Sequence, residues 1–189
     1  MFSKSYKITE PKRFEIFVED IRNDNVLVSP EYLAVCKADI RYYLGNRSLR
    51  ILKRKFPMSL IHEATGVVVR DKSGELKNGQ RVVLLPCRKS DCDGTKCEVC
   101  VRNNPHLLDN YCPESKFCSS NYDGFSKELI DLEHEYMIPI PDEIGPEAVF
   151  SELISVGCCA MSRAGFTEHE FVKSVTVWGD GIMGYIISL

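Results

Sequence analysis

The stretch TGVVVRDKSGELKNGQRVVLL, residues 65–85, contains two apolar runs separated by a polar segment. The runs at 65–70 and 81–85 are rich in valine and leucine, and valine in particular favours β-strands. The polar segment contains two expected turns, and in the second of them Asn78-Gly79 provides residues that accept positive φ angles. The stretch therefore predicts two strands connected by tight turns.

The chain on both sides of this stretch continues the same pattern. Apolar runs with strand character precede it at 13–18 and 26–28, and extended segments follow it at 126–132 and 137–141. Several strands at such short spacing predict a small barrel or sandwich rather than a parallel sheet. We therefore expect residues 1–145 to form a mainly β domain.

The pattern changes after Gly145. Pro146 suits the first turn of a helix, and apolar residues at helical spacing continue from there to about Gly165. We therefore expect a connecting helical region at 146–173, which carries Glu152 near its start.

A complete G-x-G-x-x-G motif follows, with its glycines at Gly179, Gly181 and Gly184. An apolar strand expected at 175–178 precedes it and an apolar helical segment follows it, which is the context that a dinucleotide-binding loop requires. Such a loop presents backbone N–H groups to a pyrophosphate, and the alternative is an ordinary glycine turn. A dinucleotide fold needs a βαβ unit of about 30 residues. We therefore expect 174–189 to begin a truncated Rossmann domain, in a fragment or early-terminating form of a longer protein.

Composition and charge narrow the classes of function. The 189 residues are 44% hydrophobic and 27% charged, as in soluble globular proteins, and the formal net charge is −3. A net negative charge argues against nucleic acid as a main partner, because phosphate binding requires a clustered basic surface. The dense basic run at 50–55 is interpreted as a solvated, partly helical segment, with a phosphate-binding patch as the alternative.

Membrane and export signals are not evident in the sequence. No apolar stretch approaches the roughly 20 residues that cross a bilayer, and residues 1–7 lack the hydrophobic core of a signal peptide. We therefore expect a cytoplasmic protein without membrane contact, whose thiols stay reduced. In that setting the nine cysteines are interpreted as metal ligands and core residues rather than disulfides.

One set of residues offers the mixed ligands that a catalytic Zn²⁺ accepts. Cys36 supplies a thiolate, His62 an imidazole, and Glu63 and Glu152 carboxylates. Cys36 and His62 each end an apolar segment, and each has an acidic residue nearby, Asp39 or Glu63, that can bind the metal or orient a ligand. The alternatives are a cysteine that acts as a small hydrophobe and a histidine that is a satisfied core imidazole.

A second group of cysteines lies between 87 and 118. Cys97-x-x-Cys100 is the tightest pair, and with Cys92 and Cys112 it predicts a closed four-thiolate zinc site that organises a loop poor in apolar residues. Cys87 could replace Cys92 in that site, and scattered thiols are the alternative.

The order of these motifs resembles that of zinc-dependent medium-chain dehydrogenases, such as alcohol and sorbitol dehydrogenases. Within that superfamily the chain is more similar to the ribitol-5-phosphate dehydrogenase (ribulose-5-phosphate reductase) branch. The likeness implies a partly open, GroES-like β-barrel followed by a Rossmann domain. The segments that carry it are 35–45, 57–63, 122–125, 151–157 and 178–181.

The resemblance also implies roles for the candidate residues. Cys36, His62 and Glu152 match the catalytic zinc ligands, Glu63 matches a residue that enters the coordination shell during ligand exchange, and Asp39 holds the ligand loop. The implied reaction is reduction of ribulose 5-phosphate with NADPH, or NADH as the alternative, with zinc as a Lewis acid. The full-length protein is expected to be a homodimer or homotetramer. The alternatives are a dehydrogenase for another polyol or alcohol, and a non-catalytic zinc-stabilised binding module.

Three features depart from the family pattern. Ile61 stands before His62 where relatives usually have glycine, and Ala38 stands where many carry the hydroxyl that relays a proton. The cysteine loop is also longer than usual. Near these motifs Lys37, Arg41 and Arg47 are candidates to bind a substrate phosphate, with ordinary surface charge as the alternative.

Overall fold

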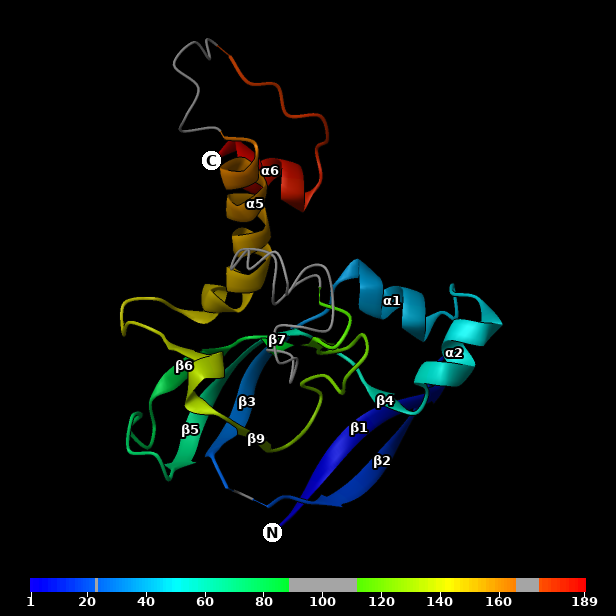
Figure 1. The fold of residues 1–189 in the computed structure, drawn as a ribbon, viewed down its shortest axis with the longest axis vertical. Helices are drawn as coiled ribbons and strands as arrows, with labels where there is room; N and C mark the ends of the chain where they lie inside the picture. Colours follow the sequence, from blue (N-terminus) through cyan, green and yellow to red (C-terminus); the bar gives the residue numbers. More distant parts are fainter. Residues whose placement is uncertain (23, 89–111, 166–173) are drawn as a thin grey trace. The chain divides into compact units, whose positions relative to one another are not determined.

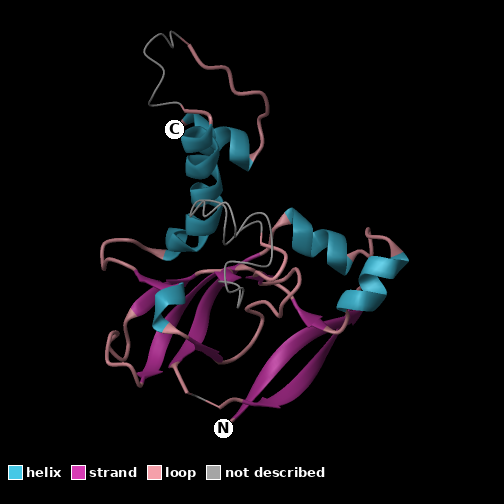
Figure 2. Ribbon diagram, in the orientation of Figure 1, coloured by secondary structure: helices cyan, strands magenta, loops and turns pink. Residues whose placement is uncertain are grey.

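The computed structural model describes residues 1–22, 24–88, 112–165 and 174–189 (Figure 1). The chain divides into two compact units, Met1–Val149 and Phe150–Leu189. The first unit consists mainly of strands and the second of helices and loops (Figure 2). None of the helices in the described part combines the length and the apolar character that a membrane span requires.

The first unit is built on antiparallel sheets. Its five-stranded sheet has the order β10-β6-β5-β3-β9, and its three-stranded sheet has the order β2-β1-β4. A further two-stranded sheet pairs β7 with β8. The bounds are β1 Phe2–Glu10, β2 Arg13–Asp20, β3 Val26–Ala34, β4 Met58–Ser59, β5 Glu63–Asp71, β6 Arg81–Leu84, β7 Cys87–Arg88, β8 Lys116–Phe117, β9 Ile130–Leu132 and β10 Met137–Pro139.

The stretch at 65–85 forms two paired strands, as its sequence predicts. β5 and β6 pair antiparallel from Ala64 opposite Leu84 to Val67 opposite Arg81. Between them Gly74 and Gly79 have φ angles of 80° and 82°, which glycine accepts without a steric penalty. The expectation of a mainly β unit is therefore confirmed.

The two larger apolar cores among the described residues stabilise this unit by removing side chains from water. The larger lies against the five-stranded sheet and includes Phe125, which is 1% exposed. The smaller joins β1 to the two short helices α1 Lys37–Tyr43 and α2 Leu49–Lys55, through Ile8, Tyr42, Leu52, Met58 and Leu60. The basic run at 50–55 is helical, as expected, whereas the sequence did not indicate β1 or α1.

The second unit contains α5 Ser151–Arg163 and α6 Ile182–Ser188. The 3-10 helix η1 His134–Tyr136 lies in the first unit, and η2 Pro146–Phe150 ends at the first residue of the second unit. The helix expected after Gly145 is therefore present. A Cβ atom on Gly157 of α5 would lie 3.3 Å from the Ile186 side chain of α6, so the small residue permits close packing.

The strand expected at 175–178 is not formed in the described structure. These residues have no strand assignment, and the Trp178 side chain is 98% exposed. A strand requires a partner for its backbone groups, and no partner strand is found among the described residues of this unit. The expected helix after the glycine motif is α6.

Candidate active site

Strand pairing brings the Cys36 and His62 segments together. β3 and β5 pair antiparallel, with Ala34 opposite Glu63, so the residues just beyond these positions are neighbours. Cys36 lies between β3 and α1, where it is the N-cap residue of the helix. The Cys36 Sγ and His62 Nε2 atoms are 3.8 Å apart. The structure therefore places this thiol and this imidazole at one site.

Asp39 connects the two segments. Its carboxylate is 2% exposed and accepts hydrogen bonds from four donors on three parts of the chain. From Cys36 it accepts the backbone N–H at 3.1 Å and the Sγ thiol at 3.2 Å. The Ile61 N–H donates at 3.1 Å and the Ser119 hydroxyl at 2.7 Å. One buried carboxylate thus positions both candidate ligands, and Ser119 is a partner that the sequence did not reveal.

A glycine on the far side of the His62 segment holds it in place. The N–H groups of Gly124 and Phe125 donate to the carbonyls of Ser59 and Ile61, at 2.7 and 2.8 Å. A Cβ atom on Gly124 would clash with the carbonyl oxygens of Leu60 and Ile61. This close approach of two backbones explains why a glycine follows Asp123.

Ile61 has a backbone conformation that its residue type disfavours. Its φ angle is 74°, in the left-handed region, where a β-branched side chain is unusual. The backbone is held there by the hydrogen bonds from the Ile61 N–H to Asp39 and from the Phe125 N–H to the Ile61 carbonyl. This geometry gives a physical reason for the glycine expected at this position in relatives.

His62 lies beside a phenyl ring and a carboxylate. Its ring centroid is 5.4 Å from that of Phe117, and its Nε2 atom is 3.8 Å from Glu63 Oε1. Glu63 is 4% exposed at the start of β5. A cation bound to the His62 imidazole could therefore also contact the Glu63 carboxylate.

The geometry of the donors fits a zinc ion. Tetrahedral zinc with Zn–S near 2.3 Å and Zn–N near 2.0–2.1 Å separates the two ligand atoms by about 3.6 Å, close to the observed 3.8 Å. Burial raises the pKa of the Cys36 thiol to about 11, and the nearby Asp39 charge also favours the neutral form. A bound cation would reverse this preference by stabilising the thiolate.

The other predicted site residues come from other helices and loops of the chain. Glu152 is in the first turn of α5 and belongs to the second unit. Lys37 and Arg41 are exposed on α1, whereas the guanidinium of Arg47 lies 5.2 Å from the Tyr42 ring. Arg47 therefore packs on an aromatic face in addition to carrying surface charge.

The cysteine loop is only partly described. Cys92, Cys97 and Cys100 lie outside the described residues. Cys112 is 4% exposed, and Cys87 is half-buried in β7. The four-thiolate zinc site therefore stays a prediction.

The glycine motif forms a tight approach to α6. Gly179 has a φ angle of 134°, and Gly181 is the N-cap residue of the helix. A Cβ atom on Gly184 would clash with the Gly179 carbonyl oxygen. At least two of the three glycines are thus required by the backbone path.

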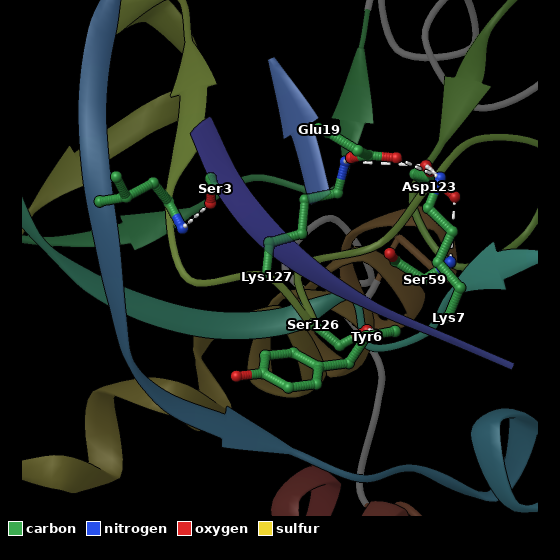
Figure 3. A network of polar contacts seen from close by, with 9 residues as sticks. Ser3, Tyr6, Lys7, Glu19, Ser59, Asp123, Ser126 and Lys127 are labelled. Atoms are coloured by element: carbon green, nitrogen blue, oxygen red, sulfur yellow. Dashed lines mark hydrogen bonds and ion pairs between the residues drawn. The ribbon is translucent and has the colours of Figure 1, made fainter. Parts of the chain in front are cut away.

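A network of charges supports the loop that contains Gly124 (Figure 3). Lys7 Nζ lies 2.7 Å from both Asp123 Oδ2 and Glu19 Oε1, and Lys127 lies within 3.7 Å of both carboxylates. Asp123 Oδ1 also accepts the Ser59 N–H at 2.9 Å. Burial opposes ionisation of Asp123, but its bonds to Lys7 and Ser59 lower its pKa below the usual value. The network therefore ties β1 and β2 to the segment that leads to His62.

Comparison with known proteins decides the family. The model of the alcohol dehydrogenase GroES-like domain matches residues 22–142. The chain belongs to this family. The expected GroES-like, mainly β architecture and the resemblance to medium-chain dehydrogenases are thereby confirmed.

The family relatives include two well-matched proteins. The chain is 35% identical over 192 residues to a ribulose-5-phosphate reductase of Bacillus spizizenii, an alignment that covers 100% of this chain and 53% of the relative. It is also similar to a solved structure of S. aureus TarJ in complex with NADPH, with a TM-score of 0.75 and 30% identity. That comparison covers 100% of this chain and 49% of the other. The chain thus spans about half the length of the relatives it matches.

A more distant relative is a sorbitol dehydrogenase of Bacillus subtilis. It is 29% identical over 171 residues, which cover 88% of this chain and 45% of the relative.

Proposed function

We propose that the chain forms the zinc-binding catalytic part of an oxidoreductase that reduces ribulose 5-phosphate to ribitol 5-phosphate with NADPH. The observation that carries the proposal is the pairing of Cys36 Sγ with His62 Nε2 at 3.8 Å, under one buried aspartate. The substrate and cofactor are supported by the ribulose-5-phosphate reductase and by the TarJ complex with NADPH, both of which match the whole chain.

Cys36, His62 and Glu152 are the proposed zinc ligands, and Glu63 is the acidic neighbour that can replace a departing ligand. Bound there, zinc supplies Lewis acidity that stabilises negative charge on a substrate oxygen. Asp39 positions the Cys36 thiol directly and His62 through the Ile61 N–H. Gly179, Gly181 and Gly184 are proposed to hold the cofactor pyrophosphate at the start of α6.

The proposed zinc ligands neither supply the proton for the product oxygen nor bind the phosphate group of the substrate. Ala38 has no hydroxyl, so the proton that neutralises the product oxygen comes from water, substrate or another side chain. Lys37, Arg41 and Arg47 are proposed to bind the substrate phosphate, because guanidinium and ammonium groups match its charge. Replacement of Arg41 by alanine should raise the KM for the phosphorylated sugar much more than for its unphosphorylated analogue. Equal effects on both substrates would exclude Arg41 from this role.

A second candidate substrate is another polyol or alcohol, which the similarity to sorbitol dehydrogenase supports. Turnover should be measured on a panel of ketose phosphates and free polyols, each with NADPH and with NADH. Faster turnover of a free polyol than of ribulose 5-phosphate would replace the proposed substrate but leave the zinc site standing.

Zinc content tests the site independently of activity. Zinc per chain should be measured in the wild type, Cys36→Ser, His62→Ala and the loop variant Cys97→Ser. We expect Cys36→Ser and His62→Ala to lose the same equivalent of zinc, while Cys97→Ser keeps it. Unchanged zinc in Cys36→Ser and His62→Ala would instead favour a binding module whose metal is held only by the loop cysteines.

A further inference from the structure

A recess beside α2 gathers positive charge in the first unit. Its volume is about 460 Å³, which is within the range of small-molecule sites. One wall is the end of α2, with Arg54 and Lys55, and the other is the turn after β8, with Ser120. Lys55 Nζ lies 3.4 Å from Ser120 Oγ, so the two walls meet at this contact. In the described part of the chain neither Arg54 nor Lys55 has a carboxylate within ion-pair distance.

The carboxylate that lines the recess is already neutralised. Asp123 Oδ2 lies 2.7 Å from Lys7 Nζ and 3.6 Å from Lys127 Nζ (Figure 3). Its other oxygen, Oδ1, accepts the Ser59 N–H. The recess therefore keeps a net positive charge, which attracts an anion.

A third cation lies close to Lys55. Lys55 Nζ is 5.5 Å from the centroid of the Tyr42 ring, and the Arg47 guanidinium is 5.2 Å from the same centroid. Arg47 Nε is buried and has no hydrogen-bond partner among the described residues, although buried polar groups normally have one. Two cations beside one ring repel each other, and a bound anion would offset this repulsion.

Helix polarity explains only part of this arrangement. Cations in the last turn of a helix are stabilised by the helix dipole, and Lys53, Arg54 and Lys55 all occupy that turn of α2. Of these three, Arg54 and Lys55 line the recess, whereas Lys53 is exposed and does not. Lys53 therefore provides a matched control, with the same charge in the same turn.

A single tight turn connects the recess to the candidate active site. The Phe117 ring contacts the His62 ring, and the Phe117 carbonyl accepts the backbone N–H groups of residues 120–122 at 3.1–3.3 Å. Ser119, in the same turn, donates its hydroxyl to Asp39. The backbone donors of the turn are thus used within it, and the groups left for a ligand are side chains.

From these observations we propose that Lys55, Arg54 and Ser120 bind a phosphate group in this recess. An ammonium and a guanidinium match its charge, and the Ser120 hydroxyl, which accepts from Lys55, can donate its own proton to a phosphate oxygen. The phosphate is either part of the substrate or a free phosphate ion. The first case rests on the proposed function and extends its set of phosphate ligands, whereas the second does not depend on it.

Titration with inorganic phosphate tests the recess without turnover. The melting temperature should be measured against phosphate concentration, with sodium chloride at matched ionic strength as the reference. We expect phosphate to raise it equally in the wild type and in Lys53→Gln. Lys55→Gln should raise the dissociation constant for phosphate roughly tenfold or more, and Ser120→Ala about two- to tenfold. The melting transitions without phosphate check that each variant is folded.

Two results of this titration would overturn the proposal. The first is a wild type that responds to phosphate no more than to chloride. The second is an equal loss in Lys53→Gln and Lys55→Gln, because the effect would then come from the general charge of α2.

Kinetic measurements distinguish the two sources of the phosphate. If it belongs to the substrate, Lys55→Gln should raise the KM for ribulose 5-phosphate roughly tenfold and leave the KM for unphosphorylated ribulose unchanged. If it is a free ion, the same variant should lose phosphate binding with both KM values unchanged. An equal rise for both sugars would overturn the assignment of Lys55 to a phosphate group.

The variant Cys36→Ser separates this proposal from the zinc site. Cys36 does not line the recess, so the variant should lose zinc and keep the response to phosphate. Loss of the response together with the zinc would place the phosphate on the metal and overturn the proposal. A wild type that binds phosphate through Lys55 but holds no zinc would instead refute the proposed function alone.

Discussion

Replacement of Ile61 by glycine and by alanine should give an unusual order of stability. Both variants lose the same isoleucine side chain, so the lost packing cancels in their difference. What remains is the backbone, which has a φ angle of 74° at this position. For a residue with a Cβ atom the left-handed conformation is less stable by about 1–2 kcal/mol, and for glycine it is not.

Glycine also has more freedom in the unfolded chain, which offsets about 0.4–1 kcal/mol of the gain. We therefore expect Ile61→Gly to unfold with a free energy about 0.5–1 kcal/mol higher than Ile61→Ala. The matched control is Ile51, 36% exposed on α2, where alanine should be more stable than glycine by about 1 kcal/mol.

Urea unfolding of the four variants measures both differences under one set of conditions. The order of glycine and alanine should be opposite at the two sites. If Ile61→Ala were as stable as Ile61→Gly or more so, the left-handed conformation of Ile61 would be wrong. The explanation of the family glycine at this position would then be wrong as well.

Three further perturbations test the surroundings of the site. Replacement of Asp39 by alanine should destabilise the fold by roughly 2–4 kcal/mol in urea unfolding, because it leaves the partly buried Ile61 N–H and the buried Ser119 hydroxyl without this acceptor. It should also lower the zinc content, and a stable variant with full zinc content would contradict this role. Replacement of Gly124 by alanine should cost about 1–3 kcal/mol in the same assay, because the new Cβ atom meets two carbonyl oxygens, and an unchanged midpoint would refute the close approach. The lowered pKa of Asp123 means that its ionic bonds stabilise the fold above the unfolded pKa, near 3.9, and are lost as the pH falls through the folded value. Melting temperatures should therefore show an advantage of wild type over Asp123→Asn at pH 7 that shrinks below about pH 4; a constant difference would exclude this linkage.

Elements with strong local signals could be predicted from the sequence. The two strands around 65–85, β2 and the helix after Gly145 each combine an apolar pattern with turn or helix-start residues, and all are present. α1 was not predicted, because its seven residues are too few to show a clear helical spacing of apolar side chains. The strand expected at 175–178 is absent because strand formation depends on a partner, which a local pattern cannot supply.

The sequence by itself determined the chemistry available to this protein: a thiol at Cys36, an imidazole at His62, a carboxylate at Asp39, and a glycine motif near the end. Those residue types and their order were sufficient to indicate the family. Only the tertiary structure decided that Cys36 and His62 lie 3.8 Å apart, that Asp39 links them through Ile61 and Ser119, and that Gly124 supports the segment from behind. The physical reason is that these contacts join residues 22 to 80 positions apart, so they depend on strand register and backbone approach rather than on local pattern.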